Sequence, residues 1–125
     1  MIEISPQLTQ LSIDIKKNRI RVHKESLHLI GDPKYIQILV NIKSRLIAIR
    51  AVESDQTDLQ SYRIDQNRME SEFSFEIYSS PFIQKLCNEF KCFKKGKCYR
   101  LTGTAVGFEK TVVFNIDSLQ EIDSM

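Results

Sequence analysis

The sequence predicts a mostly β protein with short helices, an α+β fold in which one strand–helix–hairpin pattern occurs twice. Short apolar runs separated by turn residues are found in two regions, 18–52 and 74–116, and each region also holds one segment with helical spacing. A unit of roughly 40 to 50 residues rarely buries a sufficient core alone. We therefore expect residues 1–125 to form a single domain in which two repeats share one core.

The first unit is expected at residues 12–52 and opens with a β-hairpin. Apolar and polar residues alternate on both sides of Asn18, a residue type that accepts the positive φ of a tight turn. A short helix is expected next, because Leu27 and Ile30 share one helical face and the following Gly31 is a strong helix stop. Such a short helix must be stabilised by packing.

A second hairpin completes the first unit, with apolar runs at 35–40 and 45–50. Both faces of this hairpin are apolar, which is typical of strands packed between two layers. Residues 53–72, which follow it, are polar and acidic. We expect them to form an exposed connector between the units.

The second unit is expected at residues 73–117 and begins with an alternating strand at 73–77. The helix after this strand is well marked, with Ser80 as its N-cap and Pro81 in the first helical position. Apolar residues recur along it at helical spacing, at Phe82, Ile83, Leu86, Cys87 and Phe90.

A final hairpin closes the second unit, with strands expected at 98–102 and 111–116. Residues 118–125 form an acidic tail. We expect this tail to be either loosely held or a short terminal helix.

Composition indicates a cytoplasmic protein without cofactor or metal. No stretch has the roughly 20 apolar residues that cross a bilayer, and the N-terminus lacks the basic-then-apolar order of a signal peptide. An odd number of cysteines favours reduced thiols over a disulfide framework. The three cysteines, Cys87, Cys92 and Cys98, form no Cys-x-x-Cys pair and have no histidine nearby in the sequence. Inert buried thiols are therefore favoured over a zinc site.

The net charge of +2 conceals a segregation of charge along the chain. Residues 16–50 and 85–110 are mainly basic, and the connector between them is mainly acidic. The first hairpin concentrates basic side chains that could neutralise several phosphates, although charge on a strand edge also discourages aggregation. Four lysines follow the second helix, Lys91, Lys94, Lys95 and Lys97. They could bind phosphate, or they could simply stabilise the end of the helix through its dipole.

Residues 13–25, the short helix after them and the hairpin at 35–50 resemble the AbrB-like swapped-hairpin family. That family shows an acidic residue, a turn, the motif Arg-Ile-x-Ile-Pro-Lys-Glu, a short helix ending in Leu-Gly, and a hairpin that closes on a basic residue. His23 replaces the proline of the motif, and Asn18 replaces the turn glycine. The matching positions are Asp14, Arg19, Ile20, Val22, Lys24, Glu25, Gly31 and Arg50.

Two such units in one chain resemble the tandem arrangement of the MraZ family of transcription regulators, although the second unit keeps only the order of strand, helix and hairpin. The resemblance implies a swapped-hairpin β-barrel-like core, a homodimer or higher oligomer, and DNA contacts from strands and loops around the Arg-Ile segment. The DNA-binding residues expected from this resemblance and from the basic pattern are Lys16, Lys17, Arg19, Arg21, His23, Lys24, Arg45 and Arg50.

An alternative function is a protein-interaction module with the same fold, such as an antitoxin-like or mobile-element accessory protein. Its partner would dock on the acidic connector or on the C-terminal tail. Enzymatic activity is not expected, because the chain has no Gly-rich phosphate loop, no nucleophile elbow and no supported carboxylate pair. His23 and His28 are five residues apart, with no second carboxylate or cysteine at a matching spacing, so a catalytic pairing has little support.

Overall fold

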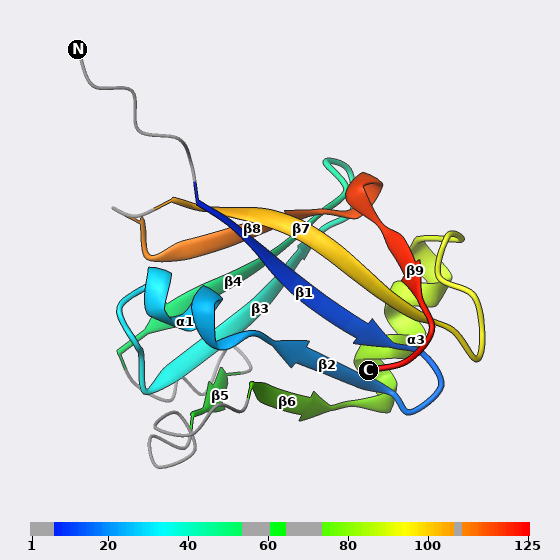
Figure 1. Ribbon diagram of the computed structural model, residues 1–125, viewed down its shortest axis with the longest axis horizontal. Helices are drawn as coiled ribbons and strands as arrows, with labels where there is room; N and C mark the ends of the chain where they lie inside the picture. Colours follow the sequence, from blue (N-terminus) through cyan, green and yellow to red (C-terminus); the bar gives the residue numbers. More distant parts are fainter. Residues whose placement is uncertain (1–6, 54–60, 65–73, 107–108) are drawn as a thin grey trace.

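The computed structural model describes residues 7–53, 61–64, 74–106 and 109–125, which form an antiparallel sheet, two α-helices and a 3-10 helix (Figure 1). This confirms the expected mostly β, α+β class. The strands are β1 (Leu8–Asp14), β2 (Arg19–Val22), β3 (Tyr35–Asn41), β4 (Leu46–Val52), β5 (Ser61–Arg63), β6 (Phe75–Tyr78), β7 (Cys98–Val106), β8 (Thr111–Asn115) and β9 (Gln120–Ile122). The helices are α1 (Lys24–Leu29), α3 (Ser80–Glu89) and the 3-10 helix η2 (Ile116–Ser118).

The sheet mixes strands from both halves of the chain. Its order is β5-β3-β4-β8-β7-β1-β2-β6, and β9 pairs with β7 outside this path. β1 pairs with β7 along its whole length, from Leu8 opposite Thr104 to Asp14 opposite Cys98. The sheet curls into a half-barrel, and α1 and α3 lie at opposite ends of it (Figure 1). Neither α-helix is long and apolar enough to cross a bilayer.

The inner face of the curled sheet holds one apolar cluster built from both halves. Side chains from the first half, such as Leu11 and Ile49, and from the second half, such as Leu101 and Phe114, are fully buried in it. Burial of these apolar side chains supplies the main driving force for folding. The two halves therefore share a single core.

Local details differ from the sequence-based expectations in the second helix and in the β3–β4 hairpin. α3 has Ser79 as its N-cap, because the Ser79 hydroxyl, and not that of Ser80, accepts a hydrogen bond from the Phe82 N–H. The expectation that the β3–β4 hairpin is buried on both faces is wrong, because Leu39 on its outer face is 36% exposed. Only the inner face of this hairpin packs in the core.

Two short strands lie in the segments expected to be the connector and the tail. β5 lies within the expected connector and pairs with β3, with Arg63 opposite Tyr35. β9 lies within the expected tail and pairs with β7, with Ile122 opposite Cys98. Each of them pairs with a longer strand, which supplies the backbone hydrogen-bonding groups that a three-residue strand needs. The rest of the connector, residues 54–60 and 65–73, lies outside the described residues.

Gly103 is required by the close approach of β7 and β8. A Cβ at this position would overlap the carbonyl oxygen of Val113 and lie 2.5 Å from Cδ1 of Phe114. Gly103→Ala is therefore expected to lower the free energy of unfolding by about 2 kcal/mol, because the backbone oxygen cannot move aside. Urea denaturation measures the loss. Thr104→Ala, on the outer face of the same strand, is the control and should change stability less; equal effects would contradict this account.

Candidate nucleic-acid interface

Arg19 lies in an ion-pair network on the outer face of the sheet. Its Nε lies 3.1 Å from Oδ2 of Asp14, and its Nη1 lies 2.7 Å from Oε2 of Glu76. Arg19 is only 8% exposed and Asp14 only 2% exposed. Arg19 therefore faces away from the apolar core, but two carboxylates hold its guanidinium against the sheet.

The pKa of Asp14 reflects this network. Burial alone would raise the pKa, but hydrogen bonds from the Lys17 backbone N–H and the Arg19 side chain outweigh burial and hold the pKa of Asp14 below its usual value. The charged carboxylate is thus the stable form. It also fixes the β1–β2 turn, because the Lys17 N–H donates to Oδ1 of Asp14 at 3.0 Å.

A second set of polar residues crosses the same face one step further along the strands. In the strand register, Ser12 on β1 lies between Arg21 on β2 and Arg100 on β7. Paired residues on neighbouring antiparallel strands point to the same side of the sheet. Arg21 has an acidic neighbour in Glu76, whose Oε1 lies 3.6 Å from Nη2 of Arg21.

His23 adjoins this row. Its Nε2 lies 2.9 Å from the Ser12 hydroxyl oxygen. Burial lowers the pKa of His23, the positive charges of Arg100 and Arg21 lower it further, and Glu25 opposes them. The neutral imidazole is therefore favoured at neutral pH, and both guanidinium groups are close enough to affect it.

Arg100 is the functional candidate that the sequence did not reveal. Its Nε is buried and has no hydrogen-bond partner among the described residues. In the sequence it is a single basic residue in an alternating strand, and only the register of β1 with β7 places it beside Ser12. No local pattern could have indicated it.

Exposed lysines from two distant segments meet at one end of the sheet. Lys16 and Lys17 lie in the β1–β2 turn, and the loop before β7 is joined to this turn by a 2.9 Å hydrogen bond from the Ile15 N–H to the Lys97 carbonyl oxygen. Nζ of Lys97 also lies 3.8 Å from Oε1 of Glu121. We call this surface the lysine end; its members are Lys16, Lys17, Lys94, Lys95 and Lys97.

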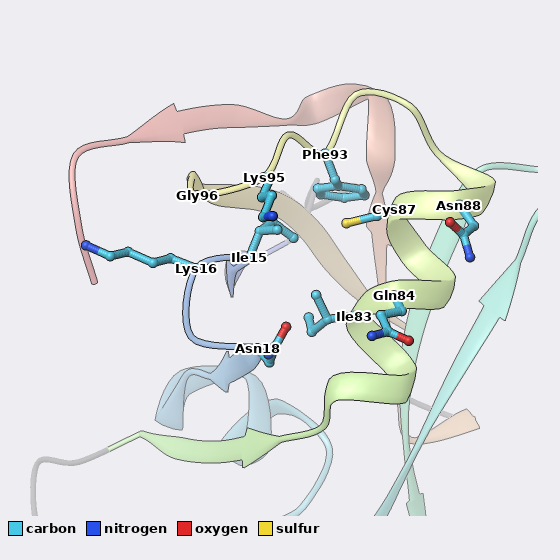
Figure 2. Close-up of a pocket in the computed structure, with 10 residues that line it drawn as sticks. All are labelled: Ile15, Lys16, Asn18, Ile83, Gln84, Cys87, Asn88, Phe93, Lys95 and Gly96. Atoms are coloured by element: carbon cyan, nitrogen blue, oxygen red, sulfur yellow. The ribbon is translucent and has the colours of Figure 1, made fainter.

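A cleft of about 720 Å³ opens beside the lysine end, between the β1–β2 turn and α3 (Figure 2). Ile83 and Phe93 line it, and the Cys87 sulfur points into it (Figure 2). Lys16 and Lys95 are also among the lining residues. The cleft thus combines apolar walls with a cationic margin.

The remaining residues expected at the site are dispersed. Nε of Arg45 lies 2.8 Å from Asp117, and its guanidinium stacks over the Phe90 ring. Arg50 donates a hydrogen bond to Gln37 on β3. Lys24 is half-buried at the start of α1. Arg45 directly precedes β4, and Arg50 lies within it. Two strands, β8 and β7, lie between β4 and β1 in the sheet.

The cysteines do not assemble into a site. Cys98 is buried on β7, and Cys87 and Cys92 are half-buried. Burial raises the pKa of Cys87 and of Cys98, so the neutral thiol is favoured in both. Within the described ranges, no group of three or more potential metal ligands occurs.

Comparison of the chain with protein-family models, curated proteins and solved structures finds no match. The resemblance to the AbrB-like family therefore rests on the residues quoted above.

Proposed function

We propose that this chain is a DNA-binding regulatory protein of the AbrB or MraZ type that contacts the phosphate backbone through the lysine end. The observation that carries this proposal is the junction of two distant lysine-rich segments on one exposed surface. Five ammonium groups on one surface can displace the counterions condensed on DNA, and this displacement drives sequence-independent binding. Arg19 braces the hairpin that presents Lys16 and Lys17.

We also propose that the fold consists of two swapped-hairpin repeats. The strand pairings support this proposal, because β1-β2-α1-β3-β4 and β5-β6-α3-β7-β8 have the same order. β1 pairs with β7 of the other half, and β5 pairs with β3 of the other half. β2 pairs with its counterpart β6, and β4 with its counterpart β8. A pseudo-twofold axis would relate these pairings.

The salt dependence of DNA binding tests the proposed function. If about five phosphates are neutralised, the slope of log K against log salt should be about −4.5, and affinity should fall roughly 500-fold between about 50 and 200 mM salt. Mobility shifts on genomic fragments and on random duplexes of equal length measure this slope. No binding at low salt, or binding independent of salt, would remove the proposal. A stoichiometric protein partner recovered in that case would favour the protein-interaction module.

A further inference from the structure

Positive charge on the outer face of β1, β2 and β7 is only partly balanced by acids. Glu76 is shared, since its Oε2 contacts Arg19 and its Oε1 lies 3.6 Å from Arg21. Asp14 is occupied by Arg19. Arg100 has no ion pair within the part of the chain that the structure describes, and its Nε is buried without a hydrogen bond. A buried, unpaired donor on a cation costs folding free energy.

The strand register places these groups around one point. Neighbouring strands are about 4.8 Å apart, so the backbones at Arg21 and Arg100 lie roughly 10 Å apart with Ser12 between them. Arginine side chains are long enough to converge from that separation. The Ser12 hydroxyl lies between the two arginines in the register, and the His23 ring is hydrogen-bonded to it.

We propose that Arg21, Arg100, Ser12 and His23 form a binding site for one tetrahedral oxyanion, a phosphate group. Guanidinium groups bind phosphate oxygens through paired N–H donors, and the serine hydroxyl donates one more hydrogen bond while accepting from Nε2 of His23. This inference deepens the proposed function. The site itself is argued from its own residues, and only the assignment of the phosphate to DNA rests on the proposed function. A DNA backbone phosphate and a free phosphate would use the same donors.

The surroundings leave room beside the site and define its pH dependence. A shallow cavity of about 260 Å³ adjoins it, lined by Leu8, Thr9, Gln10, His23, Glu25 and Thr102. The charged groups that act on His23 are Arg21 from β2, Arg100 from β7 and Glu25 from α1. A bound anion would offset the two arginines, so protonation of His23 would become easier and anion affinity should rise as the pH falls.

Titration of the whole protein with inorganic sulfate, at constant ionic strength set with chloride, tests the site. NMR should show the pKa of His23 rising with sulfate and amide shifts centred on Ser12, and thermal stabilisation by sulfate should be larger near about pH 5.5 than near about pH 7.5. Shifts confined to the lysine end, or an unchanged pKa of His23, would overturn the proposal.

Arg100→Gln should weaken sulfate binding at least tenfold and abolish the response of His23. Without sulfate, this variant should melt at the same or a higher temperature than the parent, because it removes an Nε–H donor that is buried without a hydrogen bond. Arg63→Gln, at an exposed position on β5, is the matched control and should bind sulfate like the parent. Arg100→Lys keeps the charge without the paired donors and should bind at intermediate strength. Equal binding by the parent and both Arg100 variants would contradict the site.

Titrations with inorganic phosphate and with DNA distinguish the two sources of the bound phosphate group. A DNA backbone phosphate predicts that Arg100→Gln weakens DNA binding as well as sulfate binding. Sulfate and phosphate binding that is lost in Arg100→Gln, with DNA binding unchanged or absent, would retain the anion site and assign it to a free phosphate. Failure of the proposed function and failure of this site are thus distinguishable.

Discussion

Replacement of Arg19 by methionine is expected to lower the free energy of unfolding by about 3–5 kcal/mol, because it leaves the Asp14 carboxylate buried without its cation. Methionine keeps most of the aliphatic volume of arginine, so the loss should reflect charge more than packing. Such a loss is a large part of the roughly 5–15 kcal/mol that stabilises a typical domain.

Chemical denaturation of the parent and the variant measures this effect. Lys17→Met, in the exposed β1–β2 turn of the same hairpin, is the matched control and should change stability by less than about 0.5 kcal/mol. The pKa of Asp14 is lowered in the folded protein, so its contribution is fully present above the unfolded value of 3.8 and is lost as the pH falls through the folded value. The difference between parent and variant should therefore shrink in acid.

A near-neutral effect of Arg19→Met, combined with loss of DNA binding, would restore Arg19 to the role that the family resemblance implies. The expected result is the reverse pattern. Arg19→Lys should also destabilise the protein, though less, since one ammonium group cannot replace both the Nε and Nη1 contacts.

The sequence was sufficient to predict elements whose signals are local. Alternation around Asn18 predicted the β1–β2 hairpin, and Asn18 does adopt a positive φ of 54°. Pro81 and the apolar spacing after it predicted α3 to within one residue of its cap. These signals succeed because turn conformation, capping and helical spacing depend on neighbours close in the chain.

The site could be predicted only in part, because its contacts join segments far apart in the chain. Arg19 lies on the polar side of an alternating strand. Local periodicity cannot reveal that Glu76, on the neighbouring strand β6, forms an ion pair with its guanidinium. Each lysine of the lysine end was visible in the sequence, but their assembly depends on the β1–β7 pairing. The pairing of the short strands β5 and β9 could not be predicted for the same reason, since three residues carry too little pattern to indicate which strand they pair with.

The largest functional effect is expected from reversing charge at the lysine end, in the variant Lys16→Glu, Lys17→Glu, Lys95→Glu and Lys97→Glu. Loss of four phosphate contacts and the added repulsion should weaken DNA binding about 1000-fold or more at low salt, beyond detection in a mobility shift. The protein should still fold, because all four side chains are exposed and such substitutions usually change stability little. Circular dichroism and a melting curve check that it does.

A matched control separates this surface from the overall charge of the protein. Lys34→Glu, Lys43→Glu, Arg63→Glu and Lys110→Glu change the net charge by the same amount at exposed positions outside the lysine end. This control should lose about tenfold or less, because charges farther than a Debye length of roughly 10 Å from the DNA are largely screened at 0.1 M salt. Equal losses in the two variants would mean that net charge, and not a defined interface, governs binding. A selective loss in the first variant would locate the interface where the β1–β2 turn meets the loop before β7.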